Sequence, residues 1–317
     1  MGWRDKLVSL IPNPLVRLFA GPYIAGNSLH IALNKARELW EREGLQTTLD
    51  LLGEGIKEQS DIDAEVEEYL RIVNAIDDGS FVSISLKPTQ MGLAIDPELC
   101  RANIQNIVEV AKAKGIDITI DMEESDYTDL TLELFRDLRQ NYDNVGTVLQ
   151  SRLFRTTDDI DTYLNGLNAH IRLCIGIYRE PSDIAHTDKR EMKDNFYVLV
   201  QKLWEQGHFV AIATHDEALI RRCHALARDM EIPQERYEFQ MLLGVPRHAI
   251  QQELLASGAP VRLYVPYGTT WNHAYAYARR RLVENPNIGF YVARNLPRKI
   301  WNWLTGKSRR SNKQLKP

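Results

Sequence analysis

The sequence has few cysteines, no dinucleotide-binding glycine motif and no metal-binding motif. Its cysteines are scattered, without a C-x-x-C pair or a Cys/His spacing, so we expect neither a disulfide framework nor a metal site. They are Cys100, Cys174 and Cys223. Isolated thiols are typical of a reducing compartment, and we therefore expect a cytoplasmic protein. The net charge of −4 gives no global indication of nucleic-acid binding.

Long hydrophobic runs are also missing. No apolar stretch reaches the roughly 20 residues that a membrane-spanning helix needs. The first 21 residues lack the extended hydrophobic region and the cleavage site of a signal peptide. With 44% hydrophobic and 26% charged residues over 317 positions, the composition is that of a soluble globular protein.

What is present is a regular alternation of short β-rich runs and amphipathic helical stretches. Seven runs stand out: 81–87, 116–122, 145–150, 171–178, 208–214, 237–242 and 261–267. Residues 287–293 form a weaker eighth run. Seven or eight such units without a reversal favour a closed (βα)8 barrel over an open sheet, and the missing G-x-G-x-x-G motif argues against a Rossmann domain.

The sequence divides into three parts by composition. Residues 27–78 read as helical, so we expect a helical N-terminal segment over 1–78, followed by the barrel over 79–293. Residues 294–317 contain eight Lys/Arg and no Asp/Glu, with Trp301, Trp303 and Leu304 among them. Such a tail is typical of a peripheral membrane-surface contact, and equally of a solubilising extension.

Polar residues occur at the ends of the predicted strands. They are Lys87, Asp121, Glu123, Gln150, Arg172, Tyr178, Thr214, His215, Asp216, Gln240 and Tyr264. In a (βα)8 barrel the strand ends meet on one rim, which is where reactive groups lie. Each residue alone has an ordinary explanation as a solvated or hydrogen-bonded group. Their shared position predicts one polar site, because burying them without partners would cost several kcal/mol in total.

A predicted helix after the last strong strand carries a second candidate set. Tyr277, Arg280, Arg281 and Glu284 are spaced i, i+3, i+4, i+7 and therefore share one helix face. Two neighbouring guanidiniums suit a carboxylate ligand. The alternative is a solvated basic helix face, which is the usual role of an Arg-Arg pair.

In this order the motifs resemble those of the flavin-dependent proline dehydrogenases, from about Phe81 to Pro286. The matching segments are SLKPTQMGL, DMEES, VLQ, RLCIGIYREP, ATHD, EFQML and YVPYG…RRLVENP. The resemblance implies a distorted (βα)8 barrel with noncovalent FAD. It also implies oxidation of L-proline to Δ1-pyrroline-5-carboxylate, with electrons passed to a membrane quinone.

The resemblance assigns roles residue by residue. Arg280 and Arg281 would bind the proline carboxylate, and Leu242, Tyr264 and Tyr277 would enclose its ring. The supporting residues would be Lys87, Asp121 and Glu284. The FAD contacts would be Gln150, Arg172, Gly176, Lys189, Thr214, His215 and Gln240, with Arg172 near the isoalloxazine.

One segment departs from the family pattern. The family sequence at the strand around Arg172 is close to RLVKGAY, and here it reads RLCIGIY, so that Ile175 replaces a lysine and Ile177 an alanine. Ile177 is bulkier than alanine where the backbone approaches the flavin. The departure bears on flavin pose and substrate preference.

Two other functions compete with a flavin-dependent oxidation. A barrel-type lyase would use Lys87 to form a Schiff base and the arginine pair to bind a carboxylate or phosphate. A degenerate flavin carrier at the membrane would bind FAD without being reduced by proline. A flavoprotein purifies yellow and a Schiff-base lyase does not, so the colour of the purified protein distinguishes these two. Bleaching of the flavin by proline distinguishes the dehydrogenase from the flavin carrier.

Overall fold

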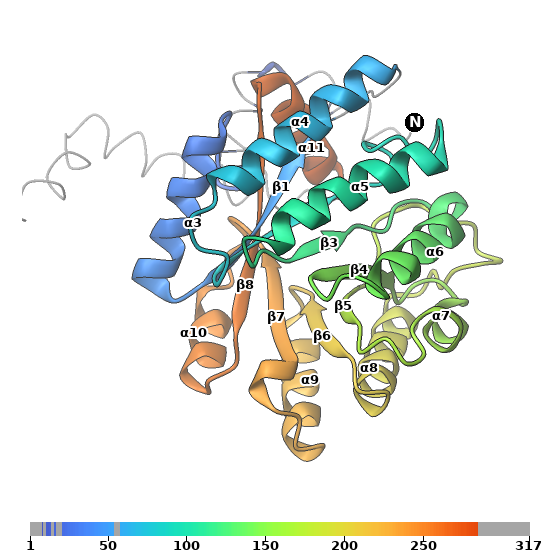
Figure 1. The fold of residues 1–317 in the computed structure, drawn as a ribbon. Coiled ribbons are helices and arrows are strands. Elements are labelled where there is room, and N and C mark those ends of the chain that lie inside the picture. The colour runs from blue at the N-terminus through green and yellow to red at the C-terminus, as the bar shows by residue number, and fades with distance from the viewer. Residues whose placement is uncertain (1–7, 9–10, 14–15, 17–20, 54–57, 285–317) are drawn as a thin grey trace, which may run out of the picture.

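Eight parallel strands close into a barrel in chain order, and β1 pairs with both β2 and β8. The structure is a computed structural model that describes the chain except for residues 1–7, 9–10, 14–15, 17–20, 54–57 and 285–317. The strands are β1 (Gln46–Leu52), β2 (Val82–Leu86), β3 (Ile118–Ile120), β4 (Val145–Gln150), β5 (His170–Cys174), β6 (Phe209–Ala213), β7 (Tyr237–Leu242) and β8 (Val261–Gly268). The predicted (βα)8 barrel is confirmed (Figure 1).

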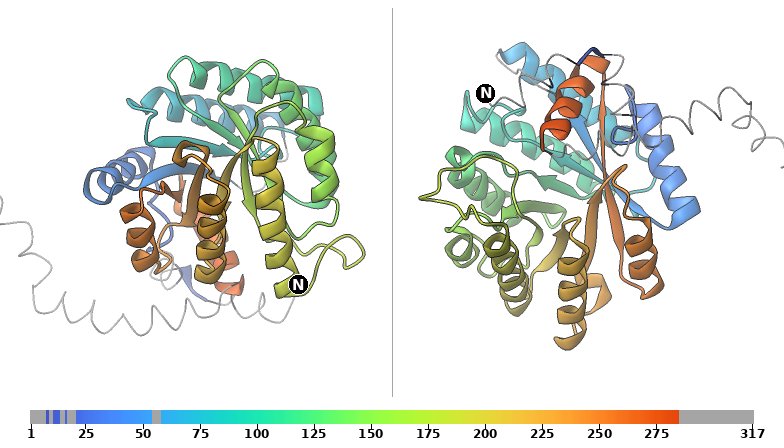
Figure 2. Two further views of the ribbon diagram at one scale, coloured as in Figure 1. Left: turned by 90° about the horizontal axis from the view of Figure 1, so that it is seen from below. Right: turned by 180° about the vertical axis from the view of Figure 1, so that it is seen from behind.

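Helices surround the strands on the outside of the barrel, as the views from below and behind show (Figure 2). They are α3 (Leu29–Glu43), α4 (Gln59–Ala75), α5 (Pro97–Lys112), α6 (Thr128–Arg139), α7 (Thr156–Tyr163), α8 (Lys189–Glu205), α9 (Glu217–Asp229), α10 (His248–Ala256) and α11 (Trp271–Glu284), with 3₁₀ turns at Ser125–Tyr127 and Gln234–Arg236. Among the described residues, no helix is both long and apolar enough to cross a bilayer.

Local sequence signals set the helix ends. The α5 helix begins after Asp96, whose carboxylate accepts hydrogen bonds from two backbone amides of the first turn, and Pro97 occupies the first helical position. Asp188 caps α8 by accepting from two backbone amides, and Asp216 caps α9 by accepting from the amide of Leu219. The α3 helix ends at Gly44, whose φ of 67° favours glycine. These ends turn the chain back toward the next strand.

The strand faces separate an apolar outer layer from a polar interior. Along β2, Ser83 and Ser85 alternate with aliphatic residues, and all of them are buried. Successive side chains of a strand point to opposite faces. The aliphatic residues pack in the main hydrophobic cluster, while both serines accept hydrogen bonds from arginines of other strands. The barrel interior is therefore lined with polar and charged groups.

The prediction that residues 27–78 are helical throughout is wrong over β1. Residues 46–52 form a strand that closes the barrel between β8 and β2, so the barrel begins at Gln46 and not at residue 79. Thr47 and Thr48 are β-branched and favour a strand, and Gly44 has already ended the preceding helix. The run at 287–293 and the tail at 294–317 lie outside the described residues.

His208, just before β6, is a buried histidine whose bonding requires the neutral ring. Its side chain is 1% exposed, and its Nδ1 accepts a hydrogen bond from the backbone amide of Ala169 at 3.1 Å. Burial lowers the pKa of His208 from 6.5 to about 4. Between pH 6.5 and about 4, His208 is protonated in the unfolded chain but not in the folded protein. The free energy of unfolding therefore falls as the pH drops through this window.

We predict that His208→Asn flattens this pH dependence, because the asparagine Oδ1 can accept the same hydrogen bond but does not titrate. Urea unfolding at pH 7.5 and pH 4.5 measures the difference in the free energy of unfolding. His248→Asn, at an exposed position, is the control and should leave the wild-type pH dependence unchanged. If the wild type and His208→Asn lost the same free energy of unfolding between pH 7.5 and pH 4.5, His208 would not be a source of the pH dependence.

Candidate active site

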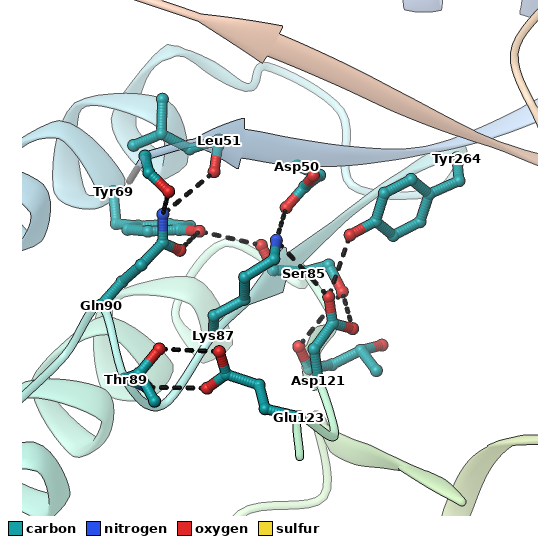
Figure 3. Close-up of polar contacts among 12 residues, drawn as sticks. Asp50, Leu51, Tyr69, Ser85, Lys87, Thr89, Gln90, Asp121, Glu123 and Tyr264 are labelled. Carbon is teal, nitrogen blue, oxygen red and sulfur yellow. Dashed lines mark hydrogen bonds and ion pairs between the residues drawn. The ribbon is translucent and has the colours of Figure 1, made fainter. Parts of the chain in front are cut away.

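Lys87 lies between two carboxylates contributed by neighbouring strands. Its Nζ donates a hydrogen bond to Oδ1 of Asp50 at 2.5 Å and lies 3.8 Å from Oδ2 of Asp121. Asp50 comes from β1, Lys87 follows β2 and Asp121 follows β3, so the three side chains meet at one rim (Figure 3). Burial acts to lower the pKa of Lys87, but the carboxylates of Asp50 and Asp121 outweigh burial and raise it. Lys87 is therefore a cation at neutral pH.

Arg172 on β5 is the second cation of the site. Its Nη1 donates to Oδ1 of Asp121 at 2.6 Å and to Oγ of Ser85 at 3.0 Å, and its Nε donates to Oε1 of Gln240 at 2.6 Å. The guanidinium carbon lies 5.2 Å from the centre of the Tyr264 ring, within reach of a cation–π interaction. The Tyr264 hydroxyl donates to Oδ2 of Asp121 at 2.9 Å. Asp121 thus holds Arg172 and Tyr264 in place.

The four ionised side chains of this cluster balance in charge. Asp50 and Asp121 face Lys87 and Arg172, and all four are buried or mostly buried. Burial raises the pKa of Asp50, while the charge of Lys87 works in the opposite direction. Burial together with the charge of Asp121 raises the pKa of Tyr264 well above 10, so its hydroxyl stays protonated and acts as a donor.

The loop that carries Lys87 is fixed by Glu123. The two Glu123 carboxylate oxygens accept hydrogen bonds from the backbone amide of Thr89 at 2.9 Å and from its hydroxyl at 2.7 Å (Figure 3). Burial raises the pKa of Glu123, and the two hydrogen bonds from Thr89 counteract burial. Thr89 lies two residues after Lys87, so Glu123 restrains the backbone that positions the lysine.

The rim beside Arg172 presents polar atoms without partners. Oε1 of Gln150, Nε of Arg152 and Nη2 of Arg172 are buried, and no described group forms a hydrogen bond with them. Gly176 lies against Gln150 and Arg152: its φ is +99°, and a Cβ there would lie 2.3 Å from Oε1 of Gln150. Buried polar groups normally have partners. These unpaired donors and acceptors fit a polar planar ligand.

The ends of β6 and β7 complete this side of the rim. Nε2 of His215 accepts a hydrogen bond from the backbone amide of Leu242 at 2.9 Å, which ties the two strand ends together. Thr214 is buried beside His215. Lys189 is exposed at the first residue of α8, and the described contacts do not join it to this cluster. One turn later, Lys193 pairs with Asp216 at 2.5 Å.

The α11 helix follows β8 and carries the predicted carboxylate-binding face. Tyr277 is buried in a small apolar cluster with Ile24 and Leu52, the last residue of β1. The backbone of α11 is described to Glu284. The side chains of Arg280, Arg281 and Glu284 lie outside the described part of the structure, so their roles stay predictions.

Sequence reasoning brought together Lys87, Asp121, Arg172, Gln240 and Tyr264, and the structure places them in one bonded cluster. It missed Asp50, Ser85 and Arg152. Asp50 was hidden by the helical interpretation of β1, although its place in the run TTLDLL, where polar and apolar residues alternate, was an available signal. Ser85 had no comparable signal, because it is uncharged and lies within a predicted strand, whereas Arg152, two residues after the predicted run 145–150, offered a signal that was not used.

Comparisons with known proteins show the family of this chain. A model of the family described as proline dehydrogenase matches residues 32–292. Proline dehydrogenase 2 of Bacillus subtilis is 38% identical over 276 residues, which cover 86% of this chain and 89% of the relative. Proline dehydrogenase of Deinococcus radiodurans is 35% identical over 280 residues, which cover 86% of this chain and 88% of the relative.

A solved structure shares the fold. Proline utilization A (PutA) from Bdellovibrio bacteriovorus, inactivated by N-propargylglycine, superposes with a TM-score of 0.76 at 24% identity. The match covers 84% of this chain and 32% of that protein, so this chain spans about a third of its length.

We predict that Asp50→Asn lowers the free energy of unfolding by about 3 kcal/mol, because it leaves Lys87 without its shortest ionic contact in a buried setting. Because the carboxylates raise the pKa of Lys87, the stability that they contribute is present below pH 10.5 and is lost at higher pH. Urea unfolding of the wild type and of Asp50→Asn at pH 7.5 measures the difference in the free energy of unfolding. Asp137→Asn, which removes an exposed partner of Arg101 at 2.8 Å, is the control and should cost less than about 1 kcal/mol. Equal small losses would show that the Asp50–Lys87 pair is energetically unimportant.

Proposed function

Because the chain belongs to the proline dehydrogenase family, we propose that it oxidises L-proline to Δ1-pyrroline-5-carboxylate with noncovalently bound FAD as its cofactor. The observation that carries the proposal is the buried guanidinium of Arg172. It is held from two sides by Asp121 and Gln240, and its Nη2 has no partner among the described residues. A cation with one NH₂ group left over suits a ligand that carries hydrogen-bond acceptors and negative charge.

The residues at the rim fit the flavin. Arg172 offers a donor and Gln150 an acceptor, and a flavin ring has both acceptors and an N–H donor along its polar edge. Glycine at position 176 lets Gln150 keep its place at the rim, because a Cβ there would lie 2.3 Å from Oε1 of Gln150. Gln240, Thr214 and His215 complete the proposed contacts, with Lys189 as an outer contact to the dinucleotide. When bound, FAD supplies the acceptor for the hydride that leaves the proline ring.

The substrate side is built from the remaining predicted residues. Lys87 is already paired with Asp50 and Asp121, so the carboxylate of proline requires other cations. We assign this role to Arg280 and Arg281, with Glu284 holding the pair. The walls of the ring pocket would be Leu242, Tyr264 and Tyr277. Fixing the carboxylate and one ring face orients the reacting carbon, which can remove several kcal/mol from the barrier.

The charge of the site favours the reactive form of proline. Oxidation removes a hydride from the carbon beside nitrogen and a proton from nitrogen, leaving a C=N bond. The nitrogen must therefore lose its positive charge before the hydride leaves. Asp50 and Asp121 are paired with Lys87 and Arg172, and the two additional arginines would bring positive charge close to the amine. Like charges disfavour the protonated amine.

The competing functions are less well supported. A Schiff-base lyase needs a neutral, nucleophilic lysine, whereas two carboxylates raise the pKa of Lys87. A degenerate flavin carrier would not need the bonded cluster of Asp121, Arg172 and Tyr264. Its distinguishing property is flavin that proline does not reduce.

We predict that the purified protein shows flavin absorbance and that anaerobic L-proline bleaches it. Arg281→Met should keep the flavin spectrum but lower kcat/KM for proline by about tenfold to a hundredfold, because a hydrogen bond to a charged group contributes about 1.5–3 kcal/mol. A colourless protein that does not take up added FAD would contradict the cofactor assignment. Normal proline kinetics in both Arg280→Met and Arg281→Met would contradict only the carboxylate assignment.

The electron acceptor is proposed to be a membrane quinone, reached through peripheral contact by residues 294–317. Their eight cations would each contribute about 1 kcal/mol near an anionic surface. Trp301, Trp303 and Leu304 would insert at the interface.

Truncation after Val292 is predicted to abolish salt-sensitive binding to anionic vesicles while leaving proline oxidation with a soluble dye intact. Sedimentation with vesicles, with neutral vesicles as the control, measures the binding. Equal binding of full-length and truncated protein would contradict the role of the tail. Loss of dye-coupled oxidation would show that these residues are needed for the fold.

A further inference from the structure

A second ion pair lies inside the barrel beside the proposed site. Nε of Arg262, on β8, donates to both carboxylate oxygens of Glu238, on β7, at 2.9 Å each. The other Arg262 nitrogens donate to the backbone carbonyl of Thr47 at 3.0 Å, to Oγ of Ser83 at 3.2 Å and to Oε1 of Gln46 at 2.9 Å. Glu238 is 3% exposed and Arg262 9%. Neither residue has a role in the reaction proposed above.

The pair is connected to Arg172 through a single side-chain amide. Nε2 of Gln240 donates to Oε1 of Glu238 at 2.5 Å, and Oε1 of Gln240 accepts from Nε of Arg172 at 2.6 Å. Burial acts to raise the pKa of Glu238, but the charge of Arg262, the neighbouring His170 and the hydrogen bonds from Gln240 and Arg262 together lower it, so Glu238 is ionised. An ionised carboxylate can only accept hydrogen bonds, and a guanidinium can only donate them. The amide of Gln240 therefore has one permitted orientation.

That orientation determines how Arg172 is held. Arg172 uses Nε for Gln240 and Nη1 for Asp121 and Ser85, and only Nη2 is left without a described partner. If the amide of Gln240 turned over, its NH₂ group would face Nε of Arg172, two donors would oppose each other, and the guanidinium would have to move. The carboxylate of Glu238 prevents this reversal.

We propose that Glu238 and Arg262 form a positioning pair that fixes the amide of Gln240 and, through it, the direction in which Arg172 presents Nη2 to the flavin. The proposal rests on the proposed function, since it assigns the pair to the same cofactor site. Arg262 keeps Glu238 ionised, and Glu238 orients Gln240. Neither residue of the pair needs to contact substrate or cofactor.

The test replaces the pair by apolar residues of similar size. In Glu238→Leu/Arg262→Met no charge is left unpaired, and such replacements of buried ion pairs are commonly tolerated. We expect a folded protein with FAD binding weakened by about tenfold to a hundredfold. We also expect a lower midpoint potential and a lower kcat at unchanged KM for proline. If the protein's preference for binding reduced over oxidised flavin falls tenfold, the midpoint potential falls by about 30 mV.

Two comparisons separate positioning from packing. Arg262→Lys keeps the charge that ionises Glu238 and should restore most of the wild-type midpoint potential. Arg221→Met/Glu253→Leu removes an exposed pair at 2.8 Å on the outer helices and should leave FAD affinity and potential unchanged. A folded Glu238→Leu/Arg262→Met protein with wild-type FAD affinity, potential and kcat would overturn the proposal.

A neutron diffraction structure of the unmodified protein tests the orientation without any variant. The proposal requires the deuterons of Gln240 on the atom facing Glu238, and deuterons facing Arg172 instead would overturn it even if the variants do not fold. Wild-type protein whose flavin is not reduced by proline would contradict the proposed function. The orientation of Gln240 would remain a separate result.

Discussion

The structure depends on pairing opposite charges inside a closed barrel. Among the described residues, six ionisable side chains form ion pairs with one another in the interior or at its rim. They are Asp50, Lys87, Asp121, Arg172, Glu238 and Arg262. Burying an unpaired charge costs several kcal/mol. The interior is thus stable only when contributions from β1, β2, β3, β5, β7 and β8 are all present, which makes closure of the barrel and assembly of the site the same event.

This pairing also determines what remains for ligands. Lys87 and Asp121 are committed to partners within the protein, whereas Arg172, Gln150 and Arg152 each retain one buried polar atom without a described partner. All three lie on or just after β4 and β5, and Gln150 and Arg152 lie against Gly176. The part of the rim with unused bonding capacity is therefore where we propose the flavin, and the α11 side is where we propose the substrate carboxylate.

The sequence allowed most of the fold to be predicted, because β2 to β8 are short, β-rich runs separated by clear helices. It did not allow β1 to be recognised, because the alternation of polar and apolar residues is weak over these seven residues between two helices. The pairing of β1 with β8 is visible only in three dimensions. Asp50 was missed with it. The predicted strand-end residues Lys87, Asp121, Arg172, Gln240 and Tyr264 meet as expected, whereas the orientation of Gln240 depends on contacts between distant strands.

The most direct test of this account is a crystal structure of the protein with its cofactor. The account predicts that Arg172 keeps its hydrogen bonds to Asp121 and Gln240 while Nη2 donates to the flavin, and that Oε1 of Gln150 gains a partner on the ring. A structure in which the flavin lies away from Arg172, or in which Nη2 is satisfied by the protein alone, would contradict it.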